Sequence, residues 1–208
     1  MTYMNHIKII AFLSLLFLST TGDAQDLPDG QLLAYFYTNK AGADPTAKTH
    51  YIQYEVTADK VLFLKCASKK KCADRDPFQV EEFSLDMRSR VRFSGRDTLY
   101  AKKHIFLPLL LEQGAEQTES SSGQGTNADL NGKFTVKITK VEGGLLYVQS
   151  RYPHNGAGNW DRDLVLKKLN NGQFLIVRDE LKVYRTDESA AFPRAHIVWE
   201  LKTAETTN

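Results

Sequence analysis

The chain contains two cysteines, Cys66 and Cys72, and they enclose three consecutive lysines. Such a pair can be a reactive thiol couple, part of a metal site or a disulfide. Zinc-ligand pairs are usually spaced more closely, and the histidines outside the N-terminal segment, at positions 50, 104, 154 and 196, are scattered. A thiolate nucleophile would need a free cysteine beside a histidine base. We therefore predict a disulfide, with no metal and no other cofactor.

The closed loop would carry a concentrated positive charge. Lys69, Lys70 and Lys71 lie inside it, and Arg75 follows shortly after. Lysines at the end of a strand often do no more than keep that end solvated. Alternatively, a loop that is already closed loses little entropy on binding, and it could recognise an acidic protein surface or an anionic component of a bacterial envelope.

A second group of candidates lies in residues 150–163, which we interpret as a long connection between two strands. Tyrosine, tryptophan and arginine dominate binding hot spots, so the group could form a binding surface. His154 with Asp161 or Asp163 could instead act as the acid/base pair of a hydrolase. Trp160 could also simply cover the core. The binding candidates are Arg151, Tyr152, His154, Trp160 and Arg162.

Recognised catalytic motifs are missing from the sequence. It has no Gly-x-Ser-x-Gly elbow, no His-Glu-x-x-His pair, no phosphate-cradling glycine loop and no EF-hand loop. We therefore expect a protein without enzymatic activity.

The N-terminal segment resembles a secretory signal peptide. Lys8 precedes an apolar run over residues 9–18, and small residues follow as far as Ala24. The run is shorter than the roughly 20 apolar residues that span a bilayer. We expect cleavage of residues 1–24, no transmembrane segment afterwards, and a periplasmic or secreted protein in which the cysteines are oxidised.

The remaining residues, 25–208, suit one domain. The formal net charge is +2, which provides no overall field for recruiting nucleic acid. Residues 118–128 are almost entirely polar or glycine, and we predict a flexible loop there.

Apolar residues recur with a period of two, which is typical of half-buried strands. Short segments rich in asparagine and glycine, at 142–144 and 170–172, predict hairpin turns between them. The fold class is thus mainly β: a single-domain antiparallel meander that forms a barrel or a strongly curved sheet, with one or two short helices. An α+β cone with helices on a curved antiparallel sheet is the alternative. The predicted strands cover residues 31–38, 49–57, 60–66, 133–141, 145–152, 163–169, 173–179, 181–185 and 196–202.

Two segments in the middle are ambiguous. Residues 76–93 fit either a helix or a long strand, because their apolar residues suit both spacings. Residues 104–111 are apolar but contain Pro108, which excludes a regular central strand and favours an edge strand or a short helix.

Aromatic residues at strand spacing could line a cavity if the meander closes, an architecture that resembles lipocalin-like carriers. The lipocalin Gly-x-Trp motif is missing. These residues are Tyr35, Tyr37, Tyr51, Tyr54, Phe63 and Tyr147.

We expect an exported binding protein of the bacterial envelope that inhibits or neutralises another protein, as immunity proteins do. A carrier of a small hydrophobic ligand is the first alternative, and a hydrolase that uses His154 is the second.

Overall fold

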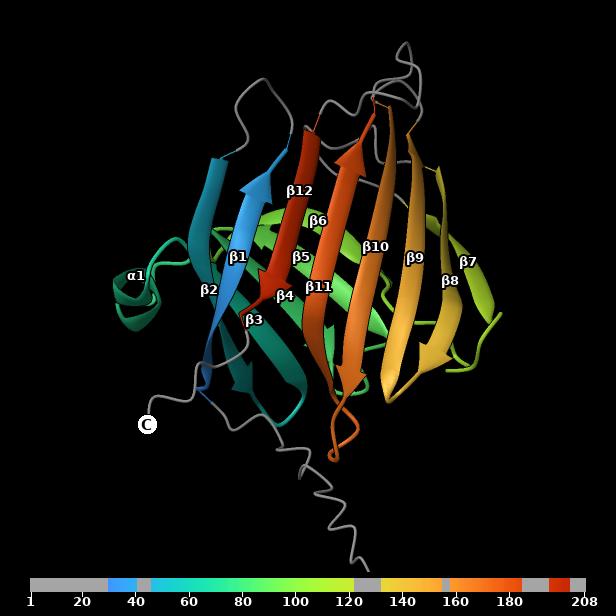
Figure 1. The fold of residues 1–208 in the computed structure, drawn as a ribbon, viewed down its shortest axis with the longest axis horizontal. Coiled ribbons are helices and arrows are strands. Elements are labelled where there is room, and N and C mark those ends of the chain that lie inside the picture. Colours follow the sequence, from blue (N-terminus) through green and yellow to red (C-terminus); the bar gives the residue numbers. More distant parts are fainter. Residues whose placement is uncertain (1–29, 41–45, 122–131, 155–157, 185–194, 203–208) are drawn as a thin grey trace, which may run out of the picture.

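The computed structural model describes residues 30–40, 46–121, 132–154, 158–184 and 195–202. These residues form one antiparallel sheet of twelve strands in the order β6-β5-β4-β3-β2-β1-β12-β11-β10-β9-β8-β7 (Figure 1). The mainly β fold and the strongly curved sheet are confirmed. The strands are β1 Leu32–Asn39, β2 Thr46–Val56, β3 Lys60–Cys66, β4 Gln79–Ser84, β5 Ser89–Ser94, β6 Thr98–Ile105, β7 Glu116–Ser121, β8 Gly132–Glu142, β9 Leu145–His154, β10 Gly158–Lys168, β11 Phe174–Val183 and β12 Ala195–Leu201.

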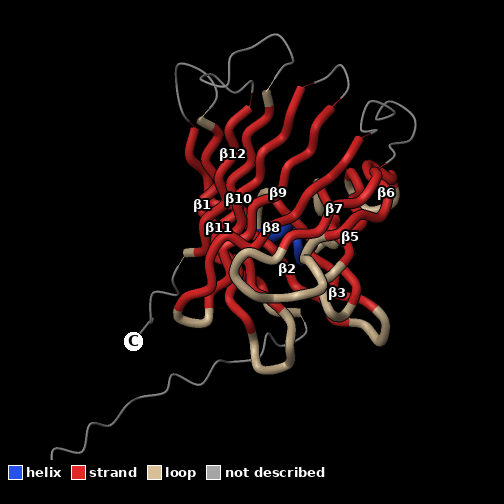
Figure 2. The backbone as a smooth tube through the Cα atoms, turned by 90° about the vertical axis from the view of Figure 1, so that its right-hand side faces the viewer, coloured by secondary structure: helices blue, strands red, loops and turns tan. Residues whose placement is uncertain are grey.

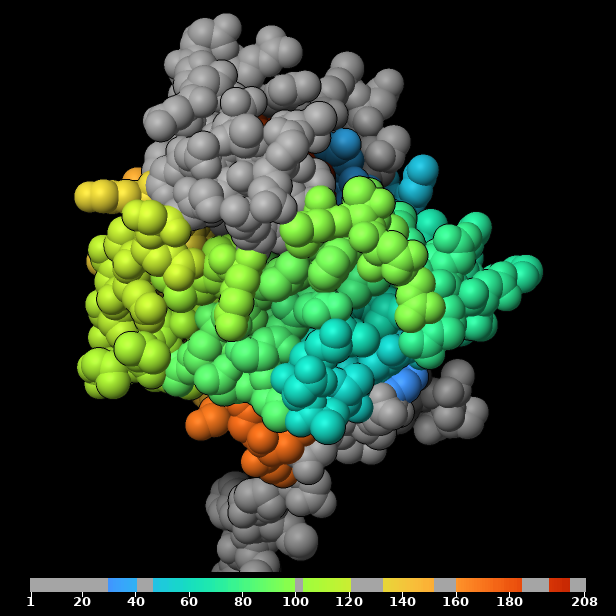
Figure 3. Space-filling view, turned by 180° about the vertical axis from the view of Figure 1, so that it is seen from behind, coloured from blue at the N-terminus to red at the C-terminus, as the bar shows by residue number. Residues whose placement is uncertain are grey.

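The sheet folds over on itself, so that β3 to β6 lie behind the strands at the front of Figure 1. Its two edges are β6 and β7, which lie near each other in the tube view of Figure 2 but do not pair. Figure 3 shows the back face, with the residues around the helix projecting at one side. The side chains that point inward from the front and back strands pack against each other between these two layers.

The predicted hairpin turns are present. Gly143 and Gly144 connect β8 to β9 with φ values of 57° and 76°, and Gly172 lies between β10 and β11 with φ 82°. Positive φ is easy for glycine because it has no Cβ atom.

Residues 76–93 form neither a helix nor one long strand. They contain β4 and β5, which pair as a hairpin, so the helical interpretation is wrong. Met87 explains the misleading spacing, because it lies in the turn with φ 52° and its side chain is fully buried. The α+β cone is also not what the described residues form, since their one helix is the short α1, Lys69–Ala73.

The apolar segment 104–111 begins as the end of the edge strand β6 and then leaves the sheet at Phe106. Phe106 and Leu107 are buried in the core, whereas Leu109 and Leu110 are 74% and 63% exposed. Of the predicted flexible loop, residues 118–121 belong to β7 instead, and residues 122–128 lie outside the described residues, as does the predicted signal peptide.

The main core lies in the interior between the two layers of the sheet. Tyr35, Tyr54 and Phe63, three of the aromatic residues predicted to line a cavity, are fully buried there. Tyr51 packs instead against a small cluster on the outer face, around the disulfide, and the ring of Tyr147 lies near Lys140. Among the residues described, no helix has the length and apolar character needed to cross a membrane.

Candidate functional site

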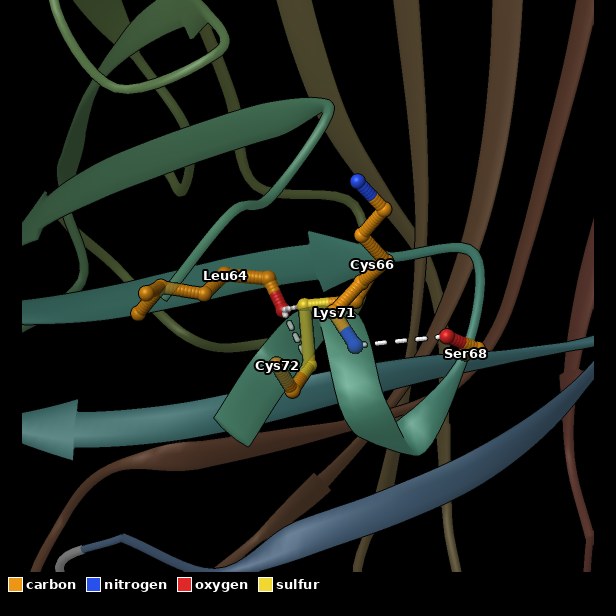
Figure 4. The surroundings of a disulfide bond; sticks show 5 residues. All are labelled: Leu64, Cys66, Ser68, Lys71 and Cys72. Carbon is orange, nitrogen blue, oxygen red and sulfur yellow. Dashed lines mark hydrogen bonds between the residues drawn. A yellow bond between two sulfur atoms is a disulfide. The ribbon is translucent and has the colours of Figure 1, made fainter. Parts of the chain in front are cut away.

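The disulfide between Cys66 and Cys72 is confirmed. It joins the end of β3 to α1, and both cysteines are buried (Figure 4). Ser68 caps the helix, because its Oγ accepts a hydrogen bond of 3.2 Å from the backbone N–H of Lys71. The disulfide therefore fixes the short loop that contains α1 against the end of β3.

The cations of this loop already have neighbours. Lys70 pairs with Asp74, Lys71 pairs with Asp76, and Arg75 lies 2.9 Å from a carboxylate oxygen of Glu55. Lys69 lies near the face of Tyr51 instead, with its Nζ 6.0 Å from the ring centroid. The cations of the three ion pairs are all exposed, so each pair contributes little and can exchange partners at low cost.

The second predicted site is divided between the two faces of the sheet. Residues 150–163 are not a long connection, because β9 continues to His154 and β10 begins at Gly158. Arg151 is exposed on the outer face, where it lies 3.5 Å from Asp161. Asp163 accepts a hydrogen bond from Gln149 there. The side chains of Tyr152 and His154 lie outside the described residues.

Arg162 points the other way, into the interior, where it is 2% exposed. It belongs to a group of buried charged side chains that we call the charge cluster. The members come from β3, β4, β5, β10 and β11 and are Lys65, Glu81, Arg90, Arg92, Arg162 and Asp179.

Glu81 is the centre of the charge cluster and is completely buried. Its carboxylate lies 3.1 Å from Lys65 Nζ, 3.4 Å from Arg90 Nη1, 3.7 Å from Arg92 Nε and 3.9 Å from Arg162 Nη2. Burial alone would raise the pKa of Glu81, but Lys65, Arg162 and Arg92 outweigh it and lower that pKa to about 2. Glu81 is therefore ionised at neutral pH.

Asp179 is the second carboxylate of the cluster. It accepts two hydrogen bonds from Arg162, from Nε at 2.7 Å and from Nη2 at 2.6 Å. This paired geometry is the strongest arrangement that a guanidinium and a carboxylate can form. Burial lowers the pKa of Arg162, but Asp179 and Glu81 raise it more, so Arg162 stays charged.

The inward orientation of Asp179 depends on an irregularity in β11. Val165 pairs with Arg178 and Leu166 pairs with Ile176, so Val177 is an extra residue on one strand. Such a β-bulge shifts the alternation of side chains by one position. Ile176 and Asp179 both point inward as a result, whereas a regular strand would have turned Arg178 inward.

The charge cluster borders a hollow in the interior. An inner compartment of about 140 Å³ has Lys65, Glu81, Arg92, Arg162 and Asp179 on one side. An outer compartment of about 350 Å³ adjoins it and has several of the same lining residues, including Arg92 and Leu181. Together they form one cavity between β3–β5 and β10–β12.

Aromatic side chains form much of the remaining wall of this cavity, together with aliphatic residues such as Leu181 and Ile197. Trp199, Tyr37 and Phe78 line the inner compartment, and Trp160 and Phe78 line the outer one. Lys65 Nζ lies 5.0 Å from the centroid of the Trp199 ring. The cavity thus combines a charged floor with an aromatic wall.

The sequence pointed to Arg162 and Trp160 as residues of an external connection and to Tyr37 as a cavity residue. It did not indicate that Lys65, Glu81, Arg92 and Asp179 meet in the interior. A signal was available for two of these residues. Lys65 has the same parity as the apolar Val61 and Phe63 in β3, and Glu81 has the same parity as Phe83 in β4. A charged residue at a core-facing position of a strand indicates a buried polar network.

The described part of the chain contains no group of three or more potential metal ligands. No protein-family model matches the chain, and neither a curated protein nor a solved structure matches it.

Proposed function

We propose that the protein is an exported binding protein that holds a small organic ligand in the cavity between β3–β5 and β10–β12. The observation that carries the proposal is the cavity itself, with its aromatic wall and charged floor. Small-molecule sites typically combine an apolar lining with a few fixed polar groups. Export is supported by the predicted signal peptide and by the disulfide.

The position of the charged residues supports binding more than hydrolysis. Asp161 and Asp163 lie on the outer face with Arg151 and Gln149, away from the cavity. The charged groups that face the cavity are cations and carboxylates already paired with one another. Such pairs can orient a ligand, whereas an acid/base catalyst has to exchange protons near neutral pH.

A variant that fills the cavity tests the proposal. Ile197 lines both compartments, so Ile197→Trp places an indole in the space that the ligand would occupy. Glu200→Trp is the matched control, because Glu200 lies on the same strand with an exposed side chain. Native mass spectrometry of protein isolated from its own cells should show a bound small molecule in the wild type and in the control, but not in Ile197→Trp. A wild-type spectrum with the bare polypeptide mass would contradict the proposal.

The disulfide-closed loop supports a second candidate function, the binding of an acidic surface on another protein that is thereby inhibited or neutralised. The observation in its favour is that the disulfide and the Ser68 cap fix the position of the short helix that carries Lys69, Lys70 and Lys71. A loop fixed in this way loses little entropy on binding.

Replacing Lys69, Lys70 and Lys71 together with serine tests this second function. Capture of a defined partner from envelope extract should fall with added salt and be lost in the variant, while the Tm stays nearly unchanged. The matched control replaces the exposed Lys167 and Lys168, at the end of β10, with serine. Capture that is equal in both variants would exclude the loop as the contact.

A further inference from the structure

The ion pairs of the charge cluster, as far as the described residues show them, contain more cations than carboxylates. Among the described residues, four cations (Lys65, Arg90, Arg92 and Arg162) surround two carboxylates (Glu81 and Asp179). Positive charge that is held in a poorly hydrated interior raises the electrostatic potential around it much more than surface charge does. An anion next to the cluster would therefore be strongly stabilised, and a cation would be repelled.

Arg162 offers a specific contact for such an anion. Its Nε and Nη2 are both used by Asp179. Its Nη1 is buried and has no hydrogen-bond partner within the described parts of the chain. Arg162 also lines the inner compartment, so this unpartnered nitrogen belongs to a side chain at the edge of the ligand site. A buried donor without a partner is costly, and an oxyanion would satisfy it with a charge-assisted hydrogen bond.

The remainder of the cavity favours a flat apolar group. Trp199 and Phe78 lie on the wall of the inner compartment, and Trp160 continues that wall in the outer one. Phe78 is 43% exposed although it is a large aromatic residue. Aromatic faces of this kind stack against planar or apolar ligand groups.

We propose that the ligand is an amphipathic acid, whose carboxylate or phosphate binds at Arg162 and whose apolar body lies against Trp199 and Phe78. The inference rests on the proposed function and adds the chemical class of the ligand. The inner compartment, at about 140 Å³, accommodates the acidic group, and the larger outer compartment accommodates the body.

The chain contains two tryptophans, Trp160 and Trp199, and both line this cavity. Tryptophan fluorescence therefore reports on binding at this place. Three ligands of one size can be titrated into the purified exported protein: phenylacetate, phenyl phosphate and the neutral phenylacetamide. An acidic group that bonds to Arg162 should bind about tenfold or more tightly than the neutral amide.

Substitution of Arg162 locates the effect. Arg162→Lys keeps the positive charge but removes Nη1 and the planar guanidinium, so the advantage of the acids over the amide should fall about tenfold. Arg151→Lys is the control, because Arg151 is exposed on the outer face and should leave all three affinities unchanged. The comparison of the three ligands on wild-type protein needs no variant, so it remains decisive if Arg162→Lys does not fold.

Each outcome gives an answer. A preference for phenylacetate supports a carboxylic acid, and a preference for phenyl phosphate supports a phosphate ester. Equal affinity for the amide would overturn the acid assignment while leaving a small-ligand binding protein intact. Failure of all three ligands to alter the fluorescence overturns the acid assignment, and a bare mass for the wild type overturns the proposed function as well.

Discussion

At the scale of single residues, Glu81 has the most demanding environment in the molecule. A carboxylate without solvent exposure is stable only because four cations and the side-chain amide of Gln79 surround it. The cations in turn need the carboxylate, because each would otherwise be buried with less compensation. Each charge in the cluster therefore stabilises those of opposite sign, and removing one side chain leaves its partners buried with a charge that is not compensated.

Glu81→Gln should therefore lower the free energy of unfolding by about 3–5 kcal/mol, the range typical of breaking a buried charge pair. The neighbouring residue provides a matched control. Glu82 lies one position further along β4, where it pairs at 3.1 Å with Lys60 and both side chains are about one-third exposed, at 30% and 37%. Glu82→Gln should cost less than about 1 kcal/mol. Urea denaturation measures both, and equal losses would contradict the assigned role of Glu81.

The same carboxylate makes stability depend on acidic pH. The pKa of Glu81 is about 2 in the folded protein, against an ordinary value of 4.5. The unfolded chain therefore takes up the proton first. The stabilisation is complete above about pH 4.5 and is lost as the pH falls through about 2. Burial raises the pKa of Glu180, but His196 and Arg178 outweigh this and lower it to about 2, so it acts in the same direction.

Urea midpoints measured from about pH 6 down to about pH 3 should fall in the wild type and in Glu82→Gln. They should fall less steeply in Glu81→Gln, in which the Glu180 contribution remains. An unchanged slope in Glu81→Gln would mean that Glu81 is not ionised in the folded protein.

At the scale of elements, the bulge in β11 determines which residues reach the cavity. Phe174 and Ile176 point inward before it, and Asp179 and Leu181 line the cavity after it. Arg178 and Glu180 are left on the outer face, where they pair with each other at 2.8 Å. One additional residue thus separates an apolar half of the strand from a cavity-lining half.

Deletion of Val177 should consequently be tolerated, because a strand without it keeps Ile176 and Asp179 on their present face. Deletion of Glu180, three positions later, should not be tolerated, since it would turn either Asp179 or Leu181 away from the cavity. Near-ultraviolet circular dichroism and tryptophan fluorescence distinguish the two variants. Native-like spectra from both would show that the faces of β11 are not set by this register.

Most of the strands could be predicted from the sequence, but the bulge and the contacts between distant strands could not. The period of two predicted nine segments that lie in strands, and the turns at 142–144 and 170–172 were correct, because these signals are local. Residues 173–179 and 181–185 were predicted as separate strands, but the structure has one strand, β11, from Phe174 to Val183. A cavity lined by aromatic residues was one of the sequence interpretations, and Tyr37 does line it. Its charged floor was not predicted, since it requires Lys65, Glu81 and Asp179 to meet across strands that are distant in sequence.

At the scale of the whole molecule, the sheet curves almost into a barrel but leaves a seam between β6 and β7. Open sheet edges expose backbone groups that can pair with other chains. Here side chains of β7 bind one such group at the end of β6 and one further backbone N–H in the segment that follows β6. The carboxylate of Glu119 accepts a hydrogen bond from the N–H of Ile105, and Gln117 Oε1 accepts one of 3.1 Å from the N–H of Leu109.

Removal of these two acceptors should loosen the seam without unfolding the sheet. In a variant with Gln117→Ala and Glu119→Ala, amide exchange at Ile105 and Leu109 should accelerate about tenfold, and the free energy of unfolding should fall by about 1–3 kcal/mol. Hydrogen exchange followed by mass spectrometry measures the first effect.

Glu116→Ala is the control for the seam, because Glu116 lies on the same strand but pairs at 3.6 Å with Lys137 of β8. If exchange at the two amides does not change in the double variant, packing of Phe106 and Leu107 holds the seam closed instead. If exchange at the two amides accelerates as expected, hydrogen bonds from polar side chains hold this seam together, whereas backbone hydrogen bonds join all the other neighbouring strands. The side chains of β7 then hold the two edges of the curved sheet together and leave fewer backbone groups for other chains to pair with.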